Sequence, residues 1–249
     1  MKRATFARLA ELRAAGTPVA LLTNLRSGSQ LLVTASGSEG ELCLDVDMVA
    51  AAQDALKSDE STSFETPAGK VFVHVFAPPP RLVVVGAVHI AEPLARMGAL
   101  AGYGVTIVDP RRAFAASQRF DGIAVSGDWP DEAMDALVPD VRTAVVTLTH
   151  DPKLDDMALL EALKSPAFYI GAIGSRKNND ARRKRLAEFD LSQEEIARLH
   201  GPVGLKIGSK TPPEIAVAIL AEMTAIRNGV DIKTFVEPPK ATTQGCAIG

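Results

Sequence analysis

The chain has 249 residues, of which 47% are hydrophobic and 23% are charged, a composition that excludes an intrinsically disordered protein. The formal net charge of −3 excludes an overall positive field that would attract nucleic acid. No apolar run approaches the roughly 20 residues of a membrane span. The only cysteines, Cys43 and Cys246, do not make a disulfide scaffold, so we expect a cytoplasmic protein with neither nucleic acid nor membrane as a partner.

The first 77 residues contain short elements that are typical of a small α+β domain. Apolar residues spaced by three predict an amphipathic helix over 5–15. Two apolar runs, 19–25 and 31–34, flank a polar stretch and predict a hairpin. A second helix is expected near 47–57. A strand is expected at 71–76, where valines alternate with aromatic residues, and we expect both of its faces to be buried.

Three prolines, 78–80, form a stiff linker between this part and the rest of the chain. Beyond them, apolar runs at 82–85, 105–108, 143–148 and 167–170 alternate with helical stretches such as 90–101 and 155–163. This alternation predicts an α/β fold, with a Rossmann-like parallel sheet domain over 81–230 that is preceded by the smaller α+β domain over 1–77. A flexible tail is expected over 231–249. Ligands of such sheets bind at the carboxyl ends of the strands, so we expect function in the loops that follow them.

The loop after the first strand of the second domain has the position of a dinucleotide-binding turn, with Gly86, Ala87, Val88 and His89. Asp109 ends the next strand about 20 residues later, where an acidic residue binds a ribose in such proteins. Val88 stands where a glycine normally lets the pyrophosphate approach, which argues against ordinary NAD binding. The alternatives are a plain turn for Gly86, a turn cap for Asp109, and a hydrogen bond from His89 to a loop carbonyl.

The loop after the strand 143–148 contains His150 and Asp151, and Asp155 and Asp156 follow in the next helix. A histidine beside several carboxylates could bind a metal or perform acid–base chemistry. Alternatively, Asp151 caps the helix and Asp155 faces the positive end of its dipole. Capping does not explain the histidine, so we interpret His150 as functional.

A third loop brings glycine, a hydroxyl and two cations to the start of a helix. Its members are Gly174, Ser175, Arg176 and Lys177. Free backbone N–H groups and cations in this arrangement suit a phosphate, although a glycine-rich turn before a solvated basic helix is the alternative. The following Arg-Arg-Lys-Arg run, 182–185, is interpreted as a solvated face or a docking surface. Farther on, Thr211 and Glu214 have the spacing of a capping box.

Together these segments resemble the XdhC/CoxI/CoxF family of accessory proteins for molybdenum hydroxylases such as xanthine and carbon monoxide dehydrogenases. The resemblance covers residues from about 81 to 228 and is carried by the order and spacing of the segments 85–91, 108–111, 148–151, 173–177, 202–208 and 211–216. The N-terminal half is similar but weaker, because Gly28 and Ser29 lack the Pro-Arg that follows them in the family.

The resemblance implies a cytoplasmic chaperone that binds the molybdenum cofactor, as molybdopterin or its cytidine dinucleotide form, and that does not itself catalyse a reaction or hold a metal of its own. It implies sulfuration of the cofactor with a cysteine desulfurase and insertion into a molybdenum hydroxylase apoenzyme. The cofactor-binding residues that we expect to line one crevice are Gly86, Ala87, Val88, His89, Asp109, Arg111, His150, Asp151, Gly174, Ser175, Arg176 and Lys177.

Three rival functions stay open from the residues alone. An NAD(P)-dependent oxidoreductase could use the same Rossmann-like fold, and a metal-dependent hydrolase could use His150 with its neighbouring carboxylates. A pure assembly adaptor without a ligand is the third. The paired domains also invite a homodimer, and Cys246 in the tail could relay sulfur or be inert.

Overall fold

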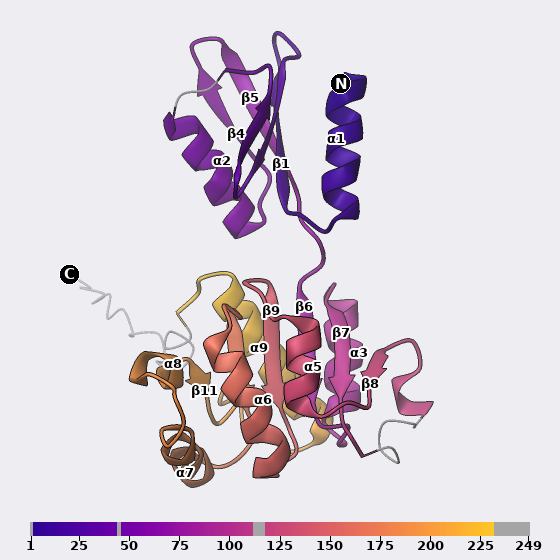
Figure 1. Cartoon of the computed structure of the whole chain (residues 1–249), viewed down its shortest axis with the longest axis vertical. Coiled ribbons are helices and arrows are strands. Elements are labelled where there is room, and N and C mark those ends of the chain that lie inside the picture. The colour runs from indigo at the N-terminus through magenta and orange to yellow at the C-terminus, as the bar shows by residue number, and fades with distance from the viewer. Residues whose placement is uncertain (1, 44–45, 112–117, 232–249) are drawn as a thin grey trace, which may run out of the picture. The chain divides into compact units, whose positions relative to one another are not determined.

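The computed structural model describes residues 2–43, 46–111 and 118–231, and the chain divides into two units, Met1–Pro78 and Pro79–Gly249 (Figure 1). The division falls inside the proline linker. Of the tail predicted from residue 231 onward, only Asp231 lies within the described residues, so Cys246 lies outside them. No helix of the described ranges has both the length and the apolarity that a membrane span needs.

The first unit is a five-stranded antiparallel sheet with the strand order β3-β2-β1-β5-β4. Its elements are α1 (Arg3–Ala14), β1 (Val19–Asn24), β2 (Gln30–Thr34), β3 (Gly37–Gly40), α2 (Val46–Ser58), β4 (Thr62–Thr66) and β5 (Gly69–Phe76). Leu22 and Val73 belong to the core on the α2 side of the sheet, and Leu21 and Leu32 belong to the core under α1. The two predicted helices and the predicted hairpin are confirmed, whereas β3 and β4 were not predicted.

The prediction that the strand 71–76 is buried on both faces is wrong. Val71 and Val73 of β5 are fully buried on the α2 side, but Phe72 and His74 on the opposite face are exposed. The helix α1 packs on that face chiefly over β1 and β2. The alternating pattern therefore identified the strand correctly, but it could not show how far the covering helix extends.

The second unit is a six-stranded parallel sheet with the order β11-β10-β9-β6-β7-β8, which confirms the Rossmann-like α/β fold. Its strands are β6 (Arg81–Val85), β7 (Gly104–Val108), β8 (Ala124–Ser126), β9 (Thr143–Thr147), β10 (Tyr169–Ala172) and β11 (Leu199–His200). Its helices are α3 (Ala91–Leu100), η1 (Gln118–Phe120), α5 (Pro130–Leu137), α6 (Pro152–Lys164), α7 (Arg176–Leu186), α8 (Gln193–Ala197) and α9 (Pro212–Arg227). The helices α3 and α9 cover one face, and α5 and α6 cover the other (Figure 1).

The strand order places a switch point between β6 and β9. The chain proceeds from β6 outward to β8 and then returns to β9 on the other side of β6. Because all six strands are parallel, their carboxyl ends lie along one edge of the sheet, which we call the carboxyl edge. Ligands of open α/β sheets bind at this edge, where the strand order reverses.

Candidate functional site

The loops after β6 and β9 touch at the switch point. Gly86 has a φ of +106°, and a Cβ atom at this position would lie 2.4 Å from Cγ2 of Thr149. Only glycine fits this conformation and this close approach. Its N–H donates to the carbonyl of Val108 at 2.8 Å, and the side chain of Val88 packs partly against the core on the α3 side. The turn thus joins three loops of the carboxyl edge.

Asp109, at the end of β7, is fully buried and is engaged on both oxygens. Its Oδ2 accepts the N–H of Ala87 and Nη2 of Arg111, each at 2.7 Å. Its Oδ1 accepts the N–H of Arg111 at 3.0 Å and its Nε at 2.8 Å. Burial raises the pKa of Asp109, but these hydrogen bonds outweigh it, so the net pKa is lowered. Asp109 therefore clamps the β6–α3 turn to the loop after β7.

Arg111 is also affected by the charges of the carboxylates that follow β9. The hydrogen bond to Asp109 is the main cause that raises the pKa of Arg111, and the charges of Asp151 and Asp155 raise it further. The guanidinium group is therefore close enough to both carboxylates for their charges to act on it. Arg111 thus connects the β7 loop electrostatically with the start of α6.

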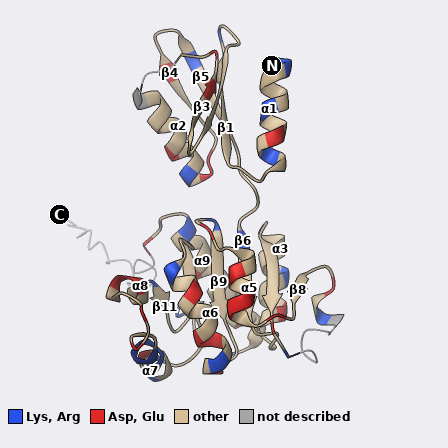
Figure 2. Cartoon of the chain, in the orientation of Figure 1, with Lys and Arg blue, Asp and Glu red and all other residues tan. Residues whose placement is uncertain are grey.

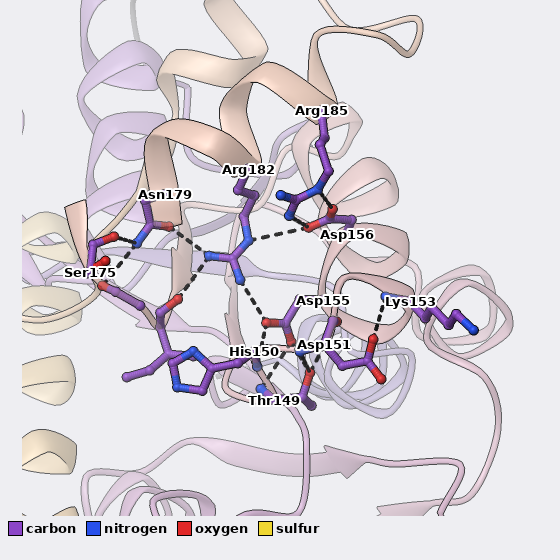
Figure 3. Close-up of polar contacts among 12 residues, drawn as sticks. Thr149, His150, Asp151, Lys153, Asp155, Asp156, Ser175, Asn179, Arg182 and Arg185 are labelled. Carbon is purple, nitrogen blue, oxygen red and sulfur yellow. Dashed lines mark hydrogen bonds and ion pairs between the residues drawn. The ribbon is translucent and has the colours of Figure 1, made fainter. Parts of the chain in front are cut away.

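A buried carboxylate, Asp155 in the first turn of α6, organises the loop after β9 (Figure 3). Its Oδ1 accepts the N–H and the hydroxyl of Thr149 at 3.1 and 2.7 Å, and its Oδ2 accepts the N–H of His150 at 3.0 Å. Burial raises the pKa of Asp155, although these contacts oppose the shift. His150 has a φ of +64°, which is uncommon for a residue with a side chain, and its imidazole is exposed. The loop thus presents His150 on a constrained backbone.

Arg182 of α7 ties this loop to the one after β10. It is 4% exposed, and its Nη2 donates to Oδ2 of Asp155 at 2.9 Å (Figure 3). Its Nη1 donates to the carbonyl of Ile173 at 2.9 Å and to Oδ1 of Asn179 at 2.8 Å. Asn179 in turn donates to two carbonyls of the same turn, including that of Gly174 (φ +130°), at 3.2 Å. The network fixes the two loops relative to each other.

The interpretation of the basic run as a solvated face is wrong for Arg182, and Arg183 and Arg185 are partly exposed but have partners of their own. Arg182 is buried, and Arg183 donates to a backbone carbonyl of β11 at 2.7 Å. Arg185 binds Asp156 with hydrogen bonds of 2.7 and 3.2 Å. Lys184 is exposed, with no hydrogen bond or ion pair within the described ranges. The spacing of three between Arg182 and Arg185 was the available signal, because it places both on one helix face, but their partners on α6 are distant in sequence.

The carboxylates near His150 have other partners than a metal. Asp155 binds Arg182, Asp156 binds Arg185, and Asp151 caps α6 by accepting the N–H of Lys153 at 3.0 Å. The predicted helix cap at Asp151 is thereby confirmed. Across the part of the chain that the structure describes, no group of three His, Cys, Asp or Glu side chains could hold a metal ion. The hydrolase alternative therefore has no ligand set there.

The groups that stay exposed at the carboxyl edge are mainly cations and imidazoles. Ser175 caps α7 by accepting a backbone N–H of its first turn at 3.2 Å. Arg176 and Lys177 follow it at the basic helix α7 (Figure 2), exposed and with no hydrogen bond or ion pair to any described residue. His89 is exposed in the turn before α3, and His150 is exposed after β9. This edge can therefore offer cations and N–H groups to an anion, and imidazoles to a polar ring.

A further buried carboxylate, Glu222 of α9, lies in contact with β10 and β11. It accepts the hydroxyl of Tyr169 at 2.5 Å and the N–H of Gly204 at 2.7 Å, and Nδ1 of His200 lies 3.4 Å from its Oε1. A Cβ at Gly204, where φ is +90°, would lie 3.1 Å from the backbone of Ala218. Glu222 thus anchors the glycine loop between β11 and α9. The predicted capping box at the start of α9 is confirmed.

The charge of Glu222 gives a prediction for acid stability. Burial raises its pKa, but the hydrogen bonds from His200, Tyr169 and Gly204 outweigh burial and lower the net pKa. A carboxylate whose pKa is lower in the folded than in the unfolded state stabilises the fold at pH values above the ordinary glutamate pKa of about 4.3. This stabilisation is lost as the pH falls through the folded-state pKa. We expect Glu222→Gln to lower the free energy of unfolding by about 1–3 kcal/mol at pH 7.

Urea unfolding at a series of pH values checks this. The loss caused by Glu222→Gln should shrink as the pH falls below about 4. Glu132→Gln, on the exposed face of α5, is the matched control and should change little at any pH. A loss that is the same at pH 7 and at low pH would contradict the assignment of the charge to Glu222.

Comparison with known proteins agrees with this architecture. The family model of the XdhC Rossmann domain matches residues 82–223. The chain is 26% identical, over 93% of its length and 67% of the relative, to a probable xanthine dehydrogenase subunit of Bacillus subtilis. It is 29% identical, over 61% of its length and 42% of the relative, to the molybdenum cofactor insertion chaperone PaoD of Escherichia coli.

Among solved structures, a xanthine dehydrogenase from Bacillus halodurans has the same fold, with a TM-score of 0.67 at 23% sequence identity. The likeness covers 92% of this chain and 65% of that one. The chain spans between 31% and 67% of the length of the curated relatives that it matches.

Proposed function

This chain belongs to the XdhC family, and from that premise we propose that it is an accessory protein of molybdenum hydroxylases that binds the molybdenum cofactor as cargo and assists its insertion. The names of two relatives support the proposal, since one is a molybdenum cofactor insertion chaperone and the other a probable subunit of xanthine dehydrogenase. We assign the binding of this cargo to the exposed groups at the carboxyl edge.

The start of α7 is the observation that carries the proposal. The helix ties Arg182, Arg183 and Arg185 to carboxylates or carbonyls, yet it leaves Arg176 and Lys177 exposed without such a contact among the described residues. Both forms of the cofactor carry phosphate. A phosphate beside these two cations would also face the N-terminal N–H groups of the helix, which favour an anion.

The remainder of the edge suits the pterin part of the cargo. A pterin ring has hydrogen-bond donors and acceptors, and the imidazoles of His89 and His150 are exposed and can supply either. The clamp at Asp109 and the network around Asp155 hold the loops in place before a ligand arrives, which lowers the entropic cost of binding. A holding role needs such a preformed site.

The finer parts of the proposal follow the family resemblance. We propose that the cargo is molybdopterin or its cytidine dinucleotide, that a cysteine desulfurase takes part in its sulfuration, and that an apo-hydroxylase of the xanthine or carbon monoxide dehydrogenase type receives it. We also propose that the protein works in the cytoplasm, as a homodimer, without turning over a substrate.

Purification from cells that also produce the molybdenum pathway tests the proposal. The protein is expected to carry a pterin, detected by fluorescence after oxidative release, together with molybdenum, detected by mass spectrometry. Turnover of NADH or NADPH by pterin-free protein would contradict the proposal and favour the oxidoreductase alternative. A bound divalent metal without pterin would favour the hydrolase, and a ligand-free protein would favour the adaptor.

Arg176→Ala should weaken retention of the cofactor by at least about tenfold, because hydrogen bonds to charged groups contribute about 1.5–3 kcal/mol. The measurement is the amount of pterin that stays bound during extensive dialysis. Lys164→Ala is the matched control, since it removes an equal charge from the last turn of α6, at the end of that helix far from the carboxyl edge. Unchanged retention in Arg176→Ala would remove Arg176 from the phosphate site.

A further inference from the structure

The outer face of α9 is apolar although it faces the solvent. Between Glu214 in the first turn and Arg227 in the last turn, the only charged residue of this helix is Glu222, which is buried. A helix that covers a sheet normally turns charged and polar residues to the solvent. Here the solvent side carries Val217, which is 46% exposed, and Ala221, which is partly exposed. The described residues therefore cover only one of the two apolar faces of α9.

A groove of about 480 Å³ lies along this outer face. It is lined by residues of α9 between 217 and 228 and by Val230, just beyond the helix. The hydroxyl of Thr224 donates to the carbonyl of Leu220 at 2.7 Å, so it needs no partner from outside. Gly229 has a φ of +67°, and the N–H of Val230 donates to the carbonyl of Ala225 at 2.8 Å. This helix end fixes the wall of the groove that Val230 provides.

The spacing of the outward residues fits a second copy of the same helix. Val217, Ala221, Thr224 and Asn228 follow one another at intervals of four, three and four residues, the repeat of helices that pack along each other. This order of intervals is the same from either end. Two copies in antiparallel orientation therefore set Val217 of one against Asn228 of the other, and Ala221 against Thr224. A two-fold symmetric dimer requires a surface that is complementary to itself in this way.

The sizes of these side chains agree with such a contact. Ala221 and Thr224, in the middle of the face, are small and let two helix axes approach to about 8 Å, the lower end of the usual range. The larger Val217 then reaches the part of the groove beside Asn228 and Val230 in the other copy. Each helix thus supplies both the side chain that fills a groove and the groove that receives one.

Charge favours the same orientation. The helix α9 carries Glu214 in its first turn and Arg227 in its last turn. Antiparallel packing brings the acidic end of each helix toward the basic end of the other, whereas parallel packing would bring like charges together. The partial charges of the helix ends add to this preference.

We propose that two copies of the chain pack through the outer faces of α9, antiparallel and about a two-fold axis, so that each copy fills the groove of the other. The inference rests on the homodimer of the proposed function and deepens it by naming the contact surface. An interface of standard size buries about 800 Å² on each copy. The 16 residues of α9 are about 24 Å long and supply the apolar centre of such an interface.

Sedimentation equilibrium of the full chain tests the proposal. The parent protein is expected to be a dimer in the micromolar range. Ala221→Glu should raise the dissociation constant at least about a hundredfold, because the contact would bring two like charges together away from water. Glutamate is a good helix former, so the monomer should keep the circular dichroism of the parent. Val141→Glu, at an exposed position between α5 and β9, is the matched control and should leave the dimer unchanged.

Cross-linking tests the orientation, in protein that also carries Cys43→Ser and Cys246→Ser. On mild oxidation, a mixture of Val217→Cys and Asn228→Cys chains should form covalent dimers. Neither variant alone should do so, because antiparallel packing keeps the two copies of position 217 about 16 Å apart along the helices. A parent protein that is monomeric throughout, an Ala221→Glu variant as dimeric as the parent, or cross-linking of Val217→Cys alone would each overturn the inference.

The failure of this inference is distinguishable from failure of the proposed function. If pterin and molybdenum copurify with the parent protein while Ala221→Glu stays dimeric, only the contact surface is wrong. If Ala221→Glu is monomeric but pterin never copurifies with the parent, the contact surface stands and the chaperone proposal is wrong.

Discussion

Arg182→Ala is expected to lower the free energy of unfolding by about 3–5 kcal/mol, because it leaves a fully buried carboxylate without its cation. Burial already raises the pKa of Asp155 above its ordinary value, although Arg182 opposes the shift. Without the guanidinium group this pKa rises further. The carbonyl of Ile173 and the side chain of Asn179 also lose their donor, so the two loops of the site lose their connection.

Chemical denaturation at pH 7 measures this loss, and its pH dependence identifies the cause. A carboxylate whose folded-state pKa is raised costs stability when it ionises, so the deficit of Arg182→Ala should shrink as the pH falls through that pKa. Adding Asp155→Asn should recover part of the loss at pH 7. Lys184→Ala, an exposed cation on the same helix, should change stability by less than about 0.5 kcal/mol. A loss below about 1 kcal/mol for Arg182→Ala would contradict the role of the network.

Gly86→Ala is the second change with a large expected effect, about 2–5 kcal/mol of the free energy of unfolding. A residue with a Cβ costs about 1–2 kcal/mol in the left-handed region, and the overlap with Thr149 adds about 1–3 kcal/mol. Thr149 is hydrogen-bonded to Asp155, which also holds the backbone of His150. The overlap between the new Cβ and Thr149 therefore displaces the loop that presents His150. Retention of the cofactor should fall together with stability.

Two matched variants separate the two causes. Gly102→Ala has a similar backbone cost, at a φ of +87°, but its Cβ meets nothing within 4 Å. Thr149→Ser removes the clashing Cγ2 and keeps the hydroxyl that binds Asp155. Combined with Gly86→Ala, it should therefore restore the part of the free energy of unfolding that the overlap with Thr149 removes. Equal losses for Gly86→Ala and Gly102→Ala would show that contact at the switch point does not matter.

Several features of the fold and the site could be predicted because they depend on neighbours in the sequence. The cap at Asp151 and the capping box of Thr211 and Glu214 join atoms only a few residues apart. The longer parallel strands and the helix α3 also follow from local hydrophobic spacing. The strands β8 and β11 were not predicted, because they have 3 and 2 residues and are too short to show a pattern.

The roles of the charged residues could not be predicted in the same way. Asp109 was expected in the cofactor crevice, at the position of an acidic ribose ligand, with a turn cap as the alternative. The cap is confirmed, because Oδ1 of Asp109 accepts the N–H of Arg111, and its Oδ2 also accepts the N–H of Ala87. Arg182 was assigned to the surface because its partner Asp155 is 27 residues away.

The alternation of strands and helices, the carboxyl-edge loops and the resemblance to the XdhC family could all be read from the amino-acid sequence, because periodicity and motif spacing are local. Which side chains of those loops remain available to a ligand could be seen only in the folded chain. That outcome depends on which loops the strand order β11-β10-β9-β6-β7-β8 brings together, and therefore on which charges become buried against one another. Arg182 and Arg176 lie on the same basic helix, yet the first is enclosed by Asp155 and Asn179 while the second is exposed at the carboxyl edge.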